Sequence, residues 1–134
     1  MPYGDLLADV VQGSTANTPP QFKDGNGTEI GTLCRAWVNF NGTGTVAIRA
    51  SFNVSSITDN GTGDYTVNFT NAMPDANYSS TFGVRAVLAG NGANFSIVIK
   101  LGTTPTASAI NVTCGAPSNA VLYDSEFVSV AIFR

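Results

Sequence analysis

The chain has 134 residues and a formal net charge of −3, with 43% hydrophobic and only 11% charged side chains. This length fits one globular domain with its own core. The low charge leaves a surface of neutral polar groups, which is typical of rigid β-proteins and of protomers covered partly by copies of themselves. The 6 Lys and Arg residues are scattered singly, which argues against a nucleic-acid partner because phosphate binding needs clustered cations. No run approaches the roughly 18 apolar residues of a membrane span, so we expect no membrane insertion.

The N-terminal quarter differs from the rest of the chain. Residues 3–12 predict a short amphipathic helix, because four apolar residues recur at helical spacing behind Asp5. So short a helix is marginal alone in water, so its apolar stripe should lie on the chain's own sandwich, on a second copy of the chain or on another protein. The stripe, which we take as a candidate attachment site, consists of Leu6, Leu7, Val10 and Val11. Residues 13–33 contain Pro19-Pro20 and several glycines and predict an extended connector. We therefore expect residues 1–33 to form an attachment or oligomerisation segment and residues 34–134 the main domain.

From residue 34 onward the pattern is that of β-strands. Two runs flank the turn at residues 41–44, and in both of them apolar residues occupy alternate positions, which predicts one face turned toward a core. The expected inward rows are Ala36, Val38 and Phe40, followed by Val46, Ile48, Ala50, Phe52 and Val54. A similar alternation marks residues 65–70, with Tyr65, Val67 and Phe69 inward, and residues 78–88, 95–101 and 107–114. Many short strands separated by turn signals predict an all-β fold, an antiparallel β-sandwich of the jelly-roll or immunoglobulin-like kind.

The last run, residues 126–133, is apolar on both faces. Such a strand is either central in its sheet or part of an interface. Phe127 and Phe133 are therefore candidates for contact between protomers. The two cysteines, Cys34 and Cys114, fit no zinc or redox spacing, and we favour free thiols over a disulfide bridge.

The composition argues against catalysis and cofactor binding. There are no histidines, which removes Ser-His and Cys-His nucleophile systems and the common zinc-protease motif. Asp59 and Asp64 flank an exposed turn rather than a cleft, so they do not suggest a glycosidase pair. Their loop lacks the spacing of an EF-hand, and Asp, Asn and Gly are the residues a tight turn uses in any case. We expect a protein with no catalytic residues, no metal and no cofactor.

Two loops, residues 60–63 and 91–95, are rich in Asn, Thr and Gly. Such groups hydrogen-bond well to sugar hydroxyls, and loops on a rigid β-scaffold commonly carry recognition. The candidate receptor-binding residues are Asn60, Thr62, Asp64, Asn91 and Asn94. Trp37 is either an exposed binding aromatic or, as is more usual in a sandwich, part of a core or interface.

One segment resembles a known group of proteins. Residues Arg35–Ser79, RAWVNFNGTGTVAIRASFNVSSITDNGTGDYTVNFTNAMPDANYS, are similar to a segment of tail-fibre and related host-adhesion proteins of tailed bacteriophages, and cover about a third of the chain. The resemblance implies an all-β tip, often homotrimeric, that recognises a bacterial surface polysaccharide or protein and has no catalytic motif. We therefore expect an oligomeric virion fibre or adhesin, assembled in the host cytoplasm and joined to other virion proteins through residues 1–33. The alternative is a structural virion component, such as a capsid decoration or head-fibre protein.

Overall fold

The computed structural model describes residues 8–15, 19–85, 95–117 and 120–134. The chain divides into two compact units, Met1–Leu33 and Cys34–Arg134. All regular structure in the described residues is β, and each recorded strand pair is antiparallel. The prediction of an all-β, antiparallel fold is thereby confirmed.

The helix expected over residues 3–12 is not seen. Residues 8–12 have no helical structure, and Val10 and Val11 are exposed; Leu6 and Leu7 lie outside the described residues. A helix this short forms in water only when an apolar face packs on something, since few backbone hydrogen bonds offset the ordering of its first turn. Both valines are also β-branched, which lowers helix propensity. The apolar spacing alone was therefore insufficient evidence for a helix.

The connector contains a small hairpin where only extended chain was expected. Strands β1 (Phe22–Lys23) and β2 (Glu29–Gly31) pair across a turn. The Asp24 carboxylate organises that turn, because its Oδ1 accepts hydrogen bonds from the backbone N–H groups of Asn26 and Thr28, both at 2.9 Å. A side chain that bonds the backbone just beyond itself is a common way to close a turn. This local chemistry gives the connector its one regular element among the described residues.

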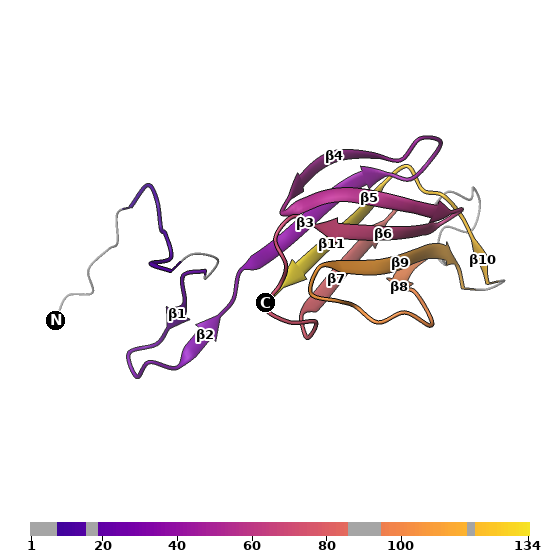
Figure 1. Cartoon of the computed structure of the whole chain (residues 1–134). Helices are drawn as coiled ribbons and strands as arrows, with labels where there is room; N and C mark the ends of the chain where they lie inside the picture. The colour runs from indigo at the N-terminus through magenta and orange to yellow at the C-terminus, as the bar shows by residue number, and fades with distance from the viewer. Residues whose placement is uncertain (1–7, 16–18, 86–94, 118–119) are drawn as a thin grey trace. The chain divides into compact units, whose positions relative to one another are not determined.

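The unit Cys34–Arg134 contains two antiparallel sheets (Figure 1). The four-stranded sheet has the order β4-β3-β11-β7. Its strands are β3 (Cys34–Asn41), β4 (Ala47–Phe52), β7 (Ser79–Val84) and β11 (Val128–Phe133). The five-stranded sheet has the order β10-β9-β6-β5, with β8 also paired to β9. Its strands are β5 (Val54–Gly61), β6 (Asp64–Phe69), β8 (Ser96–Ile99), β9 (Ala109–Ala116) and β10 (Val121–Leu122).

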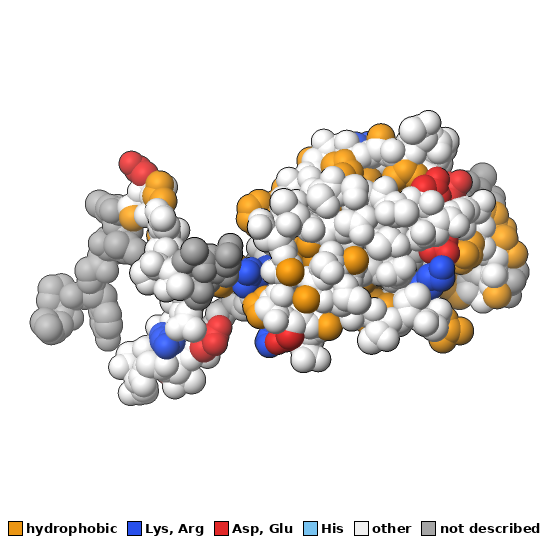
Figure 2. All heavy atoms as spheres, in the orientation of Figure 1, with side chains coloured by type: hydrophobic (Ala, Val, Ile, Leu, Met, Phe, Trp, Pro, Cys, Tyr) orange, Lys and Arg blue, Asp and Glu red, His pale blue; other side chains and the backbone are white. Residues whose placement is uncertain are grey.

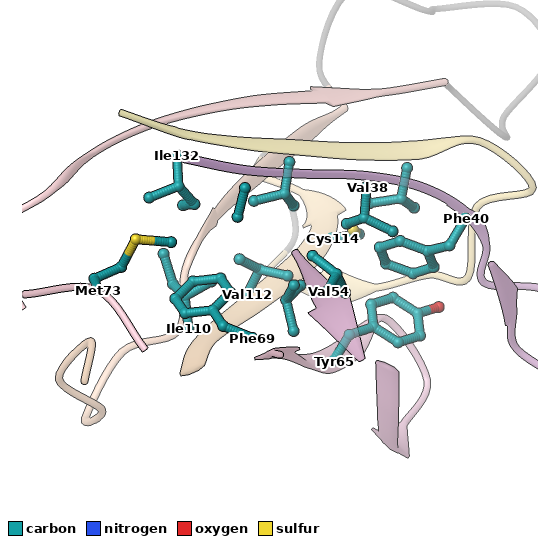
Figure 3. Packing of buried hydrophobic residues seen from close by; sticks show 14 residues of the cluster. Val38, Phe40, Val54, Tyr65, Phe69, Met73, Ile110, Val112, Cys114 and Ile132 are labelled. Atoms are coloured by element: carbon teal, nitrogen blue, oxygen red, sulfur yellow. The ribbon is translucent and has the colours of Figure 1, made fainter. Parts of the chain in front are cut away.

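The two sheets share one hydrophobic core. Figure 3 shows side chains of both sheets pointing toward one another, with Val38, Phe40 and Ile132 on one side and Tyr65, Ile110 and Val112 on the other. The rings of Phe40 and Tyr65 meet edge to face at 5.2 Å between centroids, a favourable aromatic geometry. Alternate residues of β3, β6, β9 and β11 are buried. The inward rows predicted for residues 36–40 and 65–69 are therefore confirmed, as is the central position of the last strand.

The inward row predicted for residues 46–54 is wrong in its middle. All of β4 is exposed, and its pairing with β3 shifts between Asn39 and Phe40. Ile48 pairs with the inward Phe40, whereas Phe52 pairs with the outward Trp37. A β-bulge inserts one extra residue, which moves every later side chain of that strand to the opposite face. Phe52 is consequently on the outer face of the sheet, opposite to the core.

Both cysteines are free thiols, as expected because free Cys is usually buried. Cys114 is fully buried in the core, and Cys34 is partly buried where β3 begins. Burial, with a smaller contribution from the Asp124 carboxylate, raises the pKa of Cys114 to about 12.

Candidate functional site

The outer face of the five-stranded sheet carries polar side chains, all but one of them uncharged, over three neighbouring strands, β5, β6 and β9. Because β6 and β9 turn Tyr65, Val67 and Val112 into the core, the period of two directs the intervening residues outward. Cross-strand pairing aligns these residues, with Thr66 beside both Thr58 and Asn111. We call this surface the polar face; it consists of Ser56, Thr58, Asn60, Asp64, Thr66, Asn68, Asn111 and Thr113.

Hydrogen bonds between side chains connect the three strands of the polar face. The Oγ1 of Thr66 accepts the side-chain amide N–H groups of Asn60 at 2.9 Å and Asn111 at 3.1 Å. On the next rung, the amide of Asn68 donates to Ser56 Oγ at 3.1 Å and to Thr58 Oγ1 at 3.0 Å. The amide groups are thus held in fixed orientations by their neighbours. Ordering them on binding would require little further loss of side-chain freedom.

The two charges at this surface neutralise each other. Lys100 Nζ lies 2.5 Å from Asp64 Oδ2, and neither side chain is fully exposed. The backbone N–H of Lys100 donates to the carbonyl of Asn111 on β9, which holds the lysine beside the sheet. In the view of Figure 2, which has the orientation of Figure 1, the surface over β5, β6 and β9 is largely white, meaning that few charged side chains lie there. The polar face therefore presents hydrogen-bonding groups with little net charge.

The hairpin between β5 and β6 is anchored beneath the polar face. The Oδ1 of Asp124 accepts hydrogen bonds from the Gly63 backbone N–H and the Tyr65 hydroxyl, both at 2.7 Å. The Tyr65 hydroxyl also lies 3.1 Å from the Gly42 carbonyl oxygen. Burial, together with the hydrogen bond to the Asp124 carboxylate, raises the pKa of Tyr65 far above its ordinary value. These contacts fix the position of the loop that carries Asn60, Thr62 and Asp64.

The structure brings together two of the five candidate receptor-binding residues. Asn60 and Asp64 both belong to the polar face, with the Asn60 amide 3.5 Å from the Asp64 carboxylate. Thr62 is exposed at the hairpin tip, and Asn91 and Asn94 lie outside the described residues. The contributions of Thr66, Asn68 and Asn111 were not predicted. Their signal was available, since the outward positions of the runs at residues 65–70 and 107–114 are occupied by Thr and Asn.

The outer face of the four-stranded sheet is of a different kind. Trp37 and Phe52 form a cross-strand pair there and are 40% and 56% exposed. Phe127, just before β11, is also exposed, and the Arg49 guanidinium lies 5.8 Å from the centre of its ring, within range of a cation–π contact. Phe133 is half-buried on the side of β11 that faces away from the core. We call the four aromatic residues the aromatic face; Phe127 and Phe133, the candidate interface residues, both belong to it.

Neither face contains a recorded metal site. Within residues 8–15, 19–85, 95–117 and 120–134, no group of three or more His, Cys, Asp or Glu side chains is placed to hold a metal ion. The same residues include no helix long and apolar enough to cross a membrane. The chemistry that the described surfaces offer is hydrogen bonding on one sheet and aromatic contact on the other.

Comparison with known proteins returned no match. The chain has no significant similarity to a protein-family profile, to a curated protein sequence or to a solved structure.

Proposed function

We propose that this chain is a non-catalytic fibre or adhesin protein of a bacteriophage particle that attaches to the host cell surface as an oligomer, most simply a homotrimer. The observation that carries the proposal is the difference between the two outer faces of the unit Cys34–Arg134. One face offers neutral hydrogen-bonding groups to a ligand, and the other exposes Trp37 and Phe52. Large exposed aromatic surfaces on a folded domain commonly mark contacts with other proteins.

The fold supports the same proposal. From two antiparallel sheets that share a core we infer a β-sandwich, of the jelly-roll or immunoglobulin-like kind. Such a scaffold presents two broad sheet faces and is held by hydrophobic contacts rather than by many ion pairs. The segment Arg35–Ser79, which resembles tail-fibre and host-adhesion proteins, builds β3 to β6 and thus parts of both faces.

The exposed apolar residues of the first unit, Met1–Leu33, support the proposal that this unit attaches to other virion proteins. None of its described residues is buried, and several apolar side chains, including Val10, Val11, Phe22 and Ile30, are exposed. Exposed apolar side chains such as those of these described residues gain stability when another surface covers them. Residues 1–33 are in our proposal the part of the chain that docks onto the particle.

The aromatic face predicts self-association. We expect the purified chain to sediment as an oligomer at micromolar concentration, and Phe52→Lys to shift it toward the monomer, because a charge cannot be buried in an aromatic interface without a partner. The matched control is Leu101→Lys, which alters a side chain that is 97% exposed outside the aromatic face. Analytical ultracentrifugation of the three proteins decides the matter. A wild-type monomer, or equal effects of the two substitutions, would contradict the assignment of this face.

Attachment is tested separately by Val10→Asp. We expect this variant to keep the folded β-domain, since Val10 is exposed and belongs to the other unit. The amount of the variant found in particles should fall by at least about tenfold, because an acidic group cannot enter an apolar contact without a desolvation penalty. The measurement is immunoblotting of gradient-purified particles against the unassembled fraction. Asp9→Asn, a neighbouring change that adds no charge, serves as the control. Normal incorporation of the Val10→Asp protein would remove the segment from its docking role.

The function itself is tested by locating the chain on intact particles. Antibody labelling and electron microscopy of the phage that encodes it should place the chain on the tail or baseplate, and antibodies against the β-domain should block adsorption to host cells. Labelling of capsid capsomers without an effect on adsorption would favour the alternative, a capsid decoration or head-fibre protein. Absence from the particle would overturn both.

A further inference from the structure

We propose that the receptor-binding surface is the polar face of β5, β6 and β9 rather than the loop tips, and that its ligand is an uncharged polysaccharide. The inference rests on the proposed function, of which it specifies the ligand class and the site. It is carried by the hydrogen-bonding capacity, the charge and the rigidity of the described residues on that face.

The hydrogen bonds within the face determine which groups remain for a ligand. A hydroxyl has two acceptor lone pairs and one proton to donate. The Oγ1 of Thr66 accepts from both Asn60 and Asn111, so its proton is left to donate outward. Each of these asparagines has its amide nitrogen engaged, so its side-chain carbonyl oxygen is left to accept. The face therefore presents donors and acceptors in alternation, which matches sugar hydroxyls, because each hydroxyl both donates and accepts.

The charge of the face selects against other ligands. An anionic polysaccharide or a phosphate group would need free cations, but Lys100 is paired with Asp64 at 2.5 Å. A protein partner would be expected to meet aromatic anchors in the centre of the contact, whereas the exposed Trp37 and Phe52 belong to the other sheet. An exposed apolar neighbour, Val98 of β8, pairs with Thr113 only at the border of the face. A neutral, hydroxyl-rich chain fits this combination best.

The rigidity of the face favours binding a repetitive chain. Strands in a sheet lie about 4.8 Å apart, so three strands present hydrogen-bonding groups over a flat surface rather than in a pocket. The side chains are already oriented by one another, and the backbone below them is fixed by the core and by the bonds of Asp124 to Gly63 and Tyr65. Groups that are ordered before binding lose little freedom on association. An extended ligand could therefore bind through several individually weak hydrogen bonds.

The test uses the full chain and an array of immobilised bacterial polysaccharides, neutral and acidic, as the probe. We expect binding to neutral members only, with an affinity that changes less than about twofold between about 50 and 500 mM salt, because uncharged contacts are not screened. Thr66→Val keeps the shape of the side chain but removes the hydroxyl, and should weaken binding to the best neutral polysaccharide by about tenfold. Thr104→Val, which alters an exposed side chain between β8 and β9 that is not part of the polar face, is the matched control and should bind as the wild type does. Thr62→Val, at the hairpin tip, tests the alternative that the loop tips bind the ligand.

Three results would overturn the inference: binding to no polysaccharide, a preference for acidic members that weakens with salt, or loss of binding in Thr62→Val but not in Thr66→Val. Circular dichroism of each variant shows that the fold is retained, and Asn111→Leu provides a second substitution on the same face if Thr66→Val is unstable.

The results that would contradict the proposed function differ from those that would contradict the ligand assignment. A chain located on phage tails that binds no polysaccharide would leave the adhesin function standing with another kind of receptor, whereas a chain that binds neutral polysaccharide but is absent from particles would leave the site standing and remove the virion role.

Discussion

Replacing Gly63 by alanine is expected to lower the free energy of unfolding by about 3 to 5 kcal/mol. Gly63 has a φ of +63°, and a Cβ there would lie 2.5 Å from the Cys114 carbonyl oxygen and 2.8 Å from the Tyr123 backbone nitrogen. Both obstacles are backbone atoms, so no side-chain rotation relieves them. The change would also disturb the Gly63 N–H bond to Asp124 and the Cys114 N–H bond to the Gly63 carbonyl.

Two other glycines separate the causes of this effect. Gly44 has the same φ of +63°, but a Cβ added to it would have no atom within 4 Å, so Gly44→Ala should cost only the left-handed backbone strain, about 1 to 2 kcal/mol. Gly25 has neither the positive φ nor a close neighbour, so Gly25→Ala should be nearly neutral. Urea denaturation of the three variants measures the differences. Equal losses for Gly63→Ala and Gly44→Ala would show that the hairpin tip is not confined as described.

The second large effect is a loss of stability in alkali. Burial raises the pKa of Cys114 to about 12 and that of Tyr78 to about 12, and raises the pKa of Tyr65 still further. In the unfolded chain these groups lose their protons near their ordinary pKa values of 9.0 and 10.0. Above about pH 9 the unfolded state therefore binds fewer protons than the folded state, and stability falls as the pH rises, by about 1.4 kcal/mol per pH unit for each group.

Below about pH 9 these groups are protonated in both states and their contribution is complete. By about pH 11 the combined loss should reach about 5 kcal/mol, which is comparable with the whole stability of a small domain. The measurement is guanidinium chloride denaturation from about pH 8 to pH 11 in the presence of a reducing agent. Cys114→Ala should flatten the curve between about pH 9 and pH 10, where the thiol alone titrates, and leave the steeper loss due to the tyrosines. A wild-type stability unchanged up to pH 11 would contradict the burial of these groups.

Several features of the fold were predictable from local pattern. The alternation of Ala36, Val38 and Phe40 with polar or larger neighbours, and that of Tyr65, Val67 and Phe69, identified strands and their inward faces correctly. Of the predicted receptor-binding residues, Asn60 and Asp64 lie on the polar face, and their role in binding stays a prediction.

Other features depended on partners distant in the chain. The bulge that turns Phe52 outward arises from its pairing with β3, and the pattern of β4 gave no sign of it. Within the expected helix at residues 3–12, the described residues 8–12 are not helical, and their apolar spacing carried no information about a packing surface. Thr66 became part of the site only because the sheet places Asn60 and Asn111 on either side of it, the latter 45 positions away.

The amino-acid sequence by itself determined that the chain is built from strands with one apolar side, since a period of two is a property of each strand alone. Only the tertiary structure decided which side chains come together on the outer face of each sheet. The order β10-β9-β6-β5 gathers Thr and Asn residues into one neutral surface, and the order β4-β3-β11-β7 gathers Trp37, Phe52 and Phe133 into an aromatic one. The physical reason is that each surface joins a local hairpin, β5–β6 or β3–β4, to a strand that is remote in sequence, β9 or β11. The residues of a single strand do not specify which neighbours it will have.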